Sequence, residues 1–215
     1  MSAHNNDKKS NLLNRLGIDC PDLIYLIFVL LVYALIFVLL FVMAIRSIEL
    51  IPEPTTNSSY DRAAFGTPWA DVDHNGCDTR NDILRRDLTN ITVRPNTHNC
   101  VITSGRLHDK YSGVTIYFTK DKASQVQIDH IVSLKNAWDS GADKWSPELR
   151  EKFANDPENL VAVEGSLNMS KGSKDASEWM PPENKCWYAR QQVHIKNKYG
   201  LSSTKAEHFA WAKAC

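Results

Sequence analysis

The longest run of hydrophobic residues lies near the N-terminus. Between Leu23 and Ile45 no residue is charged, and nearly all are Leu, Ile, Val, Phe, Tyr or Ala. As a helix this run would be about 35 Å long, and the hydrocarbon core of a bilayer is about 30 Å thick. A core helix of a soluble domain would carry polar residues on one face. The pattern therefore predicts one transmembrane helix over residues 23–45.

The alternative is a cleaved signal peptide, whose apolar region spans about 7–15 residues and ends at a small-residue cleavage site. This run is longer and lacks such a site, so we favour an uncleaved signal anchor in the cell membrane, in contact with the lipid bilayer. Lys8, Lys9 and Arg15 precede the run, and Arg46 alone follows it closely. The positive-inside rule then places residues 1–22 in the cytoplasm as a tail and the rest of the chain outside.

The pattern after the span indicates a short stalk and one domain. Residues 46–59 are polar and contain Pro52 and Pro54, as is typical of a linker. Residues 60–215 are long enough to bury one core. Apolar runs predict strands over 114–118, 126–132 and 160–163. Helical spacing predicts helices over 78–88, 135–142, 147–154, 166–171, 186–199 and 204–214, with Gly172 ending the fourth. The predicted class is α+β.

Cysteine positions agree with export. Cys77, Cys100, Cys186 and Cys215 follow the span, and Cys20 precedes it. An even number of exported thiols predicts disulfides, for which three pairings are possible. We favour Cys77–Cys100 and Cys186–Cys215, because each closes a local loop and contributes about 3 kcal/mol through lost chain entropy. A zinc site is disfavoured, because no C-x2-C spacing occurs.

Composition narrows the function less than the motifs do. The chain is 43% hydrophobic and 23% charged, which is globular composition and excludes general disorder. Its 25 basic and 25 acidic residues cancel, so long-range attraction to nucleic acid would be weak.

Three segments carry candidate catalytic side chains. Asp129 and His130 lie in one predicted strand, and Asn159 opens the next. Asn168 and Lys171 are three residues apart and share one face of the following predicted helix. Neighbours on a regular strand point to opposite sides, so Asp129 and His130 converge only where the strand ends or bulges.

These residues, in this order, resemble the HNH, or ββα-metal, endonuclease superfamily. Trp69 and three motifs sharpen the resemblance to a branch of exported, mostly bacterial HNH-type proteins: Tyr60-Asp-Arg-x-x-Phe-Gly, Asn75-Gly-Cys-Asp-Thr-Arg80 and Trp138-x-x-Gly-Ala. The resemblance covers about residues 60–215. It implies an α+β domain with a ββα-metal nuclease core and added helices, preceded here by the transmembrane helix.

The resemblance also implies a role for each residue. His130 matches the general base, and Asp129 matches a carboxylate ligand of a divalent cation. Asn159 matches the Asn that holds the two strands in register and helps to orient the His. Asn168 stands where many members carry a His ligand, and its amide oxygen could ligate instead. Lys171 stands where members often carry a Lys near the phosphate.

Two further features concern cations and phosphate. Asp129 and Asn168 both offer hard oxygen ligands, which favour Mg²⁺ or Mn²⁺ over Zn²⁺. Arg80 could clamp a phosphate with two hydrogen bonds, or it could pair with Asp82 at the surface. The run Asp71-x-Asp73-x-Asn75-Gly76, with Asp82 in twelfth place, is similar to an EF-hand loop but lacks the terminal Glu, so we favour a Gly-containing turn.

The leading hypothesis is a membrane-anchored, extracytoplasmic, metal-dependent endonuclease that hydrolyses phosphodiester bonds, with DNA as the expected substrate. The alternative is an inactive HNH scaffold that binds nucleic acid or a surface partner. The balanced charge slightly favours the alternative, whereas the intact set Asp129, His130 and Asn159 favours the enzyme. His has an ordinary pKa near 6.5 and can act as the base.

Overall fold

The computed structural model describes residues 20–49 and 59–215, which belong to two units that divide near residue 50. Most of the predicted cytoplasmic tail (1–22) and of the predicted stalk (46–59) lies outside the described residues.

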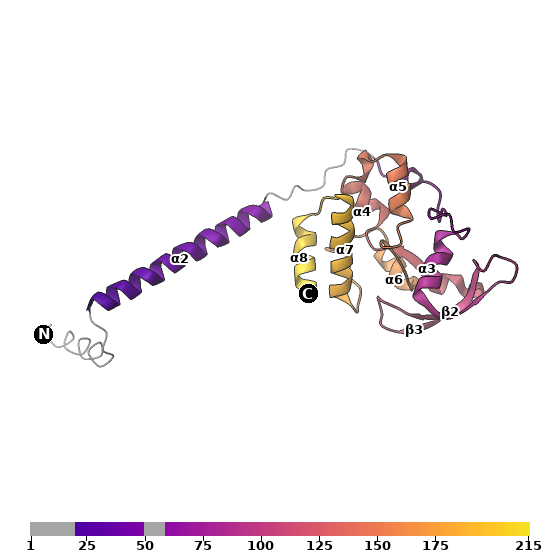
Figure 1. Cartoon of the computed structure of the whole chain (residues 1–215), viewed down its shortest axis with the longest axis horizontal. Coiled ribbons are helices and arrows are strands. Elements are labelled where there is room, and N and C mark those ends of the chain that lie inside the picture. Colours follow the sequence, from indigo (N-terminus) through magenta and orange to yellow (C-terminus); the bar gives the residue numbers. More distant parts are fainter. Residues whose placement is uncertain (1–19, 50–58) are drawn as a thin grey trace. The chain divides into compact units, whose positions relative to one another are not determined.

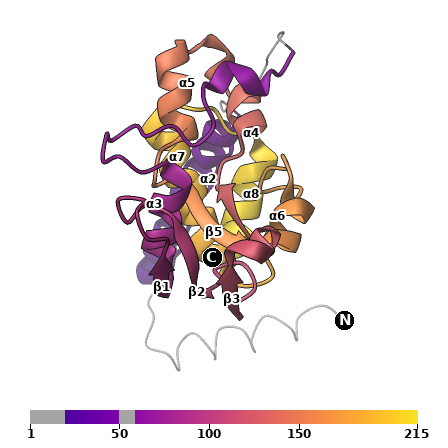
Figure 2. The same ribbon diagram turned by 90° about the vertical axis from the view of Figure 1, so that its right-hand side faces the viewer.

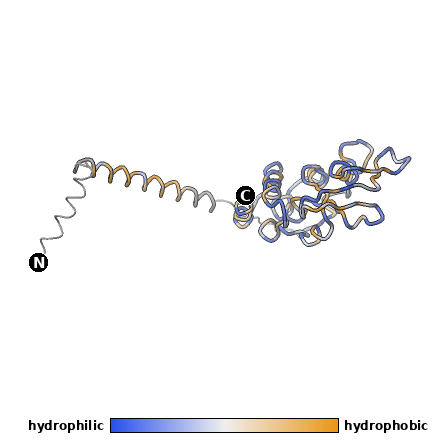
Figure 3. Tube along the Cα trace, turned by 90° about the horizontal axis from the view of Figure 1, so that it is seen from below, coloured by the Kyte–Doolittle hydropathy of each residue, from blue (hydrophilic) through white to orange (hydrophobic). Residues whose placement is uncertain are grey.

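The first unit is the helix α2 (Cys20–Glu49; Figure 1). Its segment Leu23–Met43 is long and apolar enough to cross a membrane, and the side chains of this segment are not buried within the protein. Figure 3 shows the middle of α2 coloured as hydrophobic along its length. An N-terminal signal sequence would meet the same criteria. The structure confirms that the predicted apolar segment forms a helix.

The second unit is an α+β domain, which agrees with the predicted class. Two small sheets and several helices follow one another along the chain (Figures 1 and 2). The elements are η1 (Arg62–Phe65), α3 (Thr79–Asp87), β1 (Leu88–Val93), β2 (Ile102–His108), β3 (Thr115–Thr119), η2 (Lys120–Gln125), β4 (Val126–His130), α4 (Leu134–Asp139), η3 (Ala142–Lys144), α5 (Pro147–Ala154), β5 (Leu160–Glu164), α6 (Gly165–Lys171), α7 (Lys185–Tyr199) and α8 (Lys205–Ala214).

Strands β1, β2 and β3 form an antiparallel sheet in that order (Figure 2). Helix α3 packs on this sheet through the buried side chains of Ile83 and Leu84. A glycine is needed in β2, because a Cβ on Gly105 would lie 2.7 Å from Cδ2 of Leu88 on β1. The close approach lets Leu88 enter the core that α3 and the sheet share.

Strands β4 and β5 form a second antiparallel sheet, in which Asp129 pairs with Val161 and His130 with Leu160. Helix α6 follows β5 directly and packs on both strands. The predicted strand over 126–132 ends at His130. Beyond it the amide of Ile131 still donates to the main-chain oxygen of Asn159 at 2.8 Å. Strands β4 and β5 and helix α6 thus bring Asp129, His130, Asn159 and Asn168 into one region of the domain.

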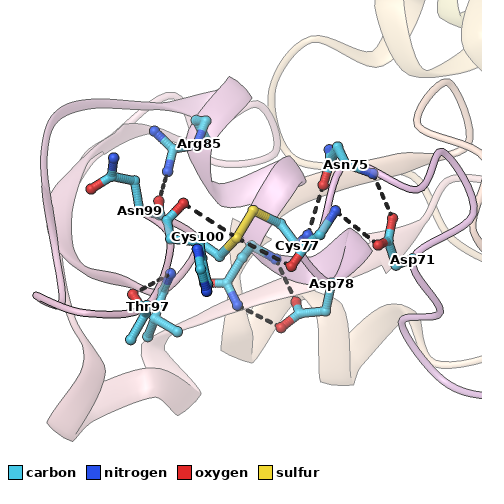
Figure 4. Close-up of a disulfide and its surroundings, with 12 residues drawn as sticks. Asp71, Asn75, Cys77, Asp78, Arg85, Thr97, Asn99 and Cys100 are labelled. Atoms are coloured by element: carbon cyan, nitrogen blue, oxygen red, sulfur yellow. Dashed lines mark hydrogen bonds between the residues drawn. A yellow bond between two sulfur atoms is a disulfide. The ribbon is translucent and has the colours of Figure 1, made fainter.

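Both favoured disulfides are present. Cys77–Cys100 joins the segment before α3 to the segment before β2, and Cys186–Cys215 joins the first turn of α7 to the end of α8. Figure 4 shows the first bridge beside Asp78, which caps α3 by accepting from the amide of Asn81 at 2.8 Å. The disulfide and the cap together fix where α3 begins.

Candidate active site

The end of β4 opens into a cavity of about 350 Å³. Asp129 and His130 both line it, as the ending of the strand at His130 allows, and Asn168 of α6 lines it too. Three of the candidate residues, from two segments of the chain, are thus brought to one place. The rest of the lining comes from β4, from η1 and α4 with the residues just before them, and from the turn after α6: Tyr60, Arg62, Ile128, Ser133, Leu134, Lys135, Gly172 and Ser173.

The imidazole of His130 is held in one orientation. Its Nε2 lies 2.7 Å from the main-chain oxygen of Ala154, the last residue of α5. A carbonyl oxygen only accepts hydrogen bonds, so Nε2 carries the hydrogen and Nδ1 carries the lone pair in the neutral ring. Burial lowers the pKa of His130 from 6.5 to about 4, and the positive charges of Lys171 and Arg62 act in the same direction. At neutral pH the ring is therefore an uncharged base.

Asp129 is 5% exposed and is bound on both oxygens. Its Oδ1 accepts from Nζ of Lys171 at 2.9 Å, and its Oδ2 accepts from the hydroxyl of Tyr111 at 2.6 Å. Burial and the Asp129 charge raise the pKa of Tyr111 well above its usual value, so its hydroxyl keeps the proton that it donates. Tyr111 lies in the connection between β2 and β3, and nothing in its local sequence distinguishes it.

Lys171 is buried, although the sequence placed it near the substrate phosphate. Its side chain is 0% exposed, and Nζ also donates to the main-chain oxygen of His130 at 2.8 Å. In this arrangement the ammonium group neutralises Asp129 and supports the end of β4. The burial of Lys171 has a physical cause, because a buried carboxylate requires a charged partner.

Asn159 is completely buried and fastens the chain that follows His130. Its Oδ1 accepts from the amide of Val132 at 2.9 Å, and its Nδ2 donates to the oxygen of the same residue at 3.2 Å. The side chain thus replaces a pair of ladder hydrogen bonds just beyond the last residue of β4. In this geometry Asn159 positions the segment around His130 and does not contact the cavity.

Asn168 is half-buried, and its Nδ2 donates to Oε1 of Gln127 on β4 at 2.8 Å. This hydrogen bond uses the nitrogen of the amide and leaves Oδ1 available as an acceptor or ligand. Asp129 retains lone pairs on both oxygens. Among residues 20–49 and 59–215, no group of three or more His, Cys, Asp or Glu side chains could hold a metal ion. In this cavity Asp129 and Asn168 would offer oxygen donors to a cation, and Asp129 already accepts from the ammonium group of Lys171.

Arg80 lies away from this cavity. It is half-buried on α3, and its Nη2 donates to the main-chain oxygen of Val126 at 3.4 Å, at the opposite end of β4 from His130. Burial lowers the pKa of Arg80, and the nearby charge of Asp78 opposes that shift.

The EF-hand-like run forms the expected turn. Oδ1 of Asp71 accepts from the amide of Asn75 at 3.1 Å, and Oδ2 accepts from the amide of Gly76 at 2.9 Å (Figure 4). Gly76 has a φ of 88°, which favours glycine. The carboxylate of Asp71 thus stabilises its own loop.

Two residues beside the site, Arg62 and Trp69, were not predicted as site residues from the sequence. Arg62 of η1 lines the cavity and is exposed. Trp69 lies nearly parallel to the His130 ring, with 6.2 Å between the ring centroids and 16° between the planes. Both belong to segments that the family resemblance covers, which was the one available signal.

The comparison with known families identifies a nuclease family. Residues 78–214 match the family of GmrSD restriction endonucleases, C-terminal domain, so the chain belongs to this nuclease family. The resemblance to nucleases is thereby confirmed. An uncharacterized secreted protein from Arthroderma benhamiae is 42% identical over 138 residues, or 62% of this chain. The chain spans 64% of the length of that relative.

Proposed function

We propose that this chain is a membrane-anchored, extracytoplasmic endonuclease that hydrolyses the phosphodiester bonds of DNA. The observation that carries the proposal is the neutral, oriented imidazole of His130 in a cavity shared with Asp129 and Asn168. Strands β4 and β5 with helix α6 would form the ββα-metal core of an HNH nuclease. The match to a nuclease family supports this assignment.

The chemistry follows from the positions of the side chains. Nδ1 of His130 takes a proton from the attacking water, while the Nε2 hydrogen bond to Ala154 keeps the ring in place. Lys171 and Asn159 position the end of β4 without touching the substrate. Mg²⁺ or Mn²⁺ bound by Asp129 and Asn168 would stabilise the negative charge on the phosphate and the leaving oxygen. Arg80 has no role in this scheme.

A nicking assay tests the assignment of the base. Full-length protein in detergent micelles is mixed with supercoiled plasmid and Mg²⁺ or Mn²⁺. We expect His130→Ala to lower the rate by about 10²–10⁴-fold, the usual effect of losing a general base. His194→Ala is the matched control, because His194 is half-exposed on α7 and pairs with Glu158. A His130→Ala protein that nicks at the wild-type rate would exclude His130 as the base.

The metal assignment makes a separate prediction at Asn168. Asn168→Ala should weaken Mn²⁺ binding in calorimetry, whereas Asn168→Asp adds a charge and should tighten it. Asn168→His adds an imidazole and should extend metal use toward Ni²⁺ or Zn²⁺. Unchanged Mn²⁺ affinity in Asn168→Ala means that Asn168 is not a ligand.

One observation favours the alternative function, an inactive scaffold that binds nucleic acid. The charge of Asp129, the one carboxylate among the proposed ligands, is already balanced by buried Lys171. The nicking assay separates the two functions, because the scaffold would retain DNA in a gel-shift experiment and leave the plasmid supercoiled with every metal.

Anchoring is proposed on three observations. Helix α2 contains a span-length apolar segment, the second unit contains two disulfides, and a relative is described as secreted. Residues 23–45 would cross the bilayer with residues 1–22 in the cytoplasm.

A further inference from the structure

A second cavity adjoins the candidate active site on another side of His130. It has a volume of about 410 Å³, within the range of about 300–1,000 Å³ that is usual for ligand sites. Most of its wall is apolar and comes from η1 and the segment that follows it. Its lining includes Arg62, Phe65, Pro68, Trp69 and His130.

The two cavities are continuous in their lining. Arg62, His130 and Leu134 belong to both, so the two cavities meet at these side chains. A phosphodiester placed at His130 carries a nucleoside on each side. One of these nucleosides therefore lies at the apolar cavity.

The wall of this cavity suits a flat ring. Trp69 is half-buried and lies nearly parallel to the imidazole, and buried Phe65 and the adjacent Pro68 complete an apolar surface. Every nucleobase has a π-face that can stack on an aromatic side chain, whatever its sequence identity. Trp69 has a φ of 58°, a backbone conformation that residues other than glycine rarely adopt. Its main-chain oxygen accepts from the amide of Thr79 at 3.3 Å. The ring is thus placed by a specific backbone turn.

The charge at the rim suits a phosphate. Three cationic side chains surround His130, and two of them are paired: Lys171 with buried Asp129, and Lys135 with Asp139 at 2.5 Å. The third, Arg62, is exposed where the two cavities meet, and its side chain also forms a hydrogen bond with that of Tyr60. A guanidinium group can donate two parallel hydrogen bonds to a phosphate.

We infer that this cavity is a nucleobase subsite, in which an unpaired base stacks against Trp69 while Arg62 binds the adjoining phosphate. The inference rests on the proposed function, because it takes the phosphodiester to lie at His130. It names the substrate class as nucleic acid with a base free to leave its stack, as in a single strand.

The test measures binding without cleavage. Full-length protein in detergent, with a chelator present, is titrated into a dye-labelled single-stranded oligonucleotide, and fluorescence anisotropy gives the affinity. An abasic oligonucleotide of the same length is the second ligand. For the wild-type protein we expect the loss of the bases to weaken binding by roughly 5- to 150-fold per stacked base.

The variants separate stacking from charge. Trp69→Leu keeps apolar bulk and should bind both oligonucleotides with similar affinity, whereas Trp69→Phe should keep the preference for bases. Trp187→Ala is the matched control, because Trp187 lies on α7 beside Lys110 and outside this cavity. Arg62→Gln should weaken both ligands by the same factor, and Arg106→Gln on the exposed side of β2 should weaken neither.

Each outcome decides the inference independently of catalysis. If Trp69→Leu keeps the wild-type preference for bases, the subsite is overturned, even if the plasmid is nicked normally. If the preference depends on Trp69 and yet no protein nicks DNA, the subsite stands and the proposed enzymatic function fails. Thermal unfolding of each variant shows whether it is folded. If Trp69→Leu is not folded, the separate variants Trp69→Phe and Arg62→Gln carry the test.

Discussion

Asp129 depends on two neighbours that lie far from it in the sequence. Lys171 and Tyr111 bind its two oxygens, and all three side chains are almost completely buried. A buried ion pair repays the cost of its desolvation only while both charges are present. The carboxylate of Asp129 and the ammonium group of Lys171 therefore contribute to the stability of the fold only as a pair.

Removal of the ammonium group should reveal this dependence. We expect Lys171→Met to lower the free energy of unfolding by about 3–5 kcal/mol, because Asp129 is left buried without its counter-charge. Lys174→Met is the control, since Lys174 is exposed three residues further on. Urea denaturation measures both. Equal stability of the two variants would contradict the buried pair.

The protonation of His130 should also be shifted. In the metal-free protein, NMR titration of the ring should give a midpoint near pH 4 instead of about 6.5, because burial disfavours the imidazolium. Between pH 6.5 and 4 the unfolded chain binds the proton first, so the free energy of unfolding should fall as the pH falls through this window. A midpoint at 6.5 would show that the ring is not desolvated.

At the scale of secondary-structure elements, the local sequence pattern predicted the elements around the candidate site better than strands β1 and β2. Helix α5 was predicted to the residue, and β3, β5 and α6 to within one residue, because their apolar positions or capping residues are clear. The predicted helix over 78–88 ends one residue earlier, since Leu88 begins β1. The helix predicted over 135–142 is divided into α4 and η3.

Strands β1 and β2 were not predicted. Leu88 is the one fully buried residue of β1, and β2 buries only Ile102 and Leu107. Ile91 and Val93 of β1 are apolar but only half-buried, the pairing register of β1 is irregular between Thr89 and Val93, and the other positions of both strands are polar or glycine, so no regular alternation marks them as strands. Their pairing depends on α3 covering one face of the sheet, which no local pattern reveals.

The sequence predicted those residues of the candidate site whose order along the chain matches a motif. It did not predict the position of a residue whose contacts depend on burial in the folded domain. The order of Asp129, His130, Asn159 and Asn168 was enough to place them near one another. Lys171 is a residue type that is usually exposed, and its burial depends on a carboxylate 42 positions earlier. Arg62 reaches the site through the packing of η1 on α4 and α5, and Trp69 through the turn that its main chain makes with Thr79.

At the scale of the whole molecule, the proposed topology divides the five cysteines between two redox environments. Cys77, Cys100, Cys186 and Cys215 should be oxidised in cells, and Cys20 should be reduced. Differential alkylation followed by mass spectrometry measures each thiol. Four free distal thiols would reverse the proposed orientation.

The hydrogen bond from His130 to Ala154 has an evolutionary consequence. The acceptor is a main-chain oxygen, so no exchange of the side chain at position 154 can delete it. The same holds for the main-chain partners of Lys171 and Asn159. Lineages can therefore drift at positions 154 and 132 without losing the orientation of the His130 ring. Insertions or deletions within α5, which shift the backbone itself, are the changes that selection must remove.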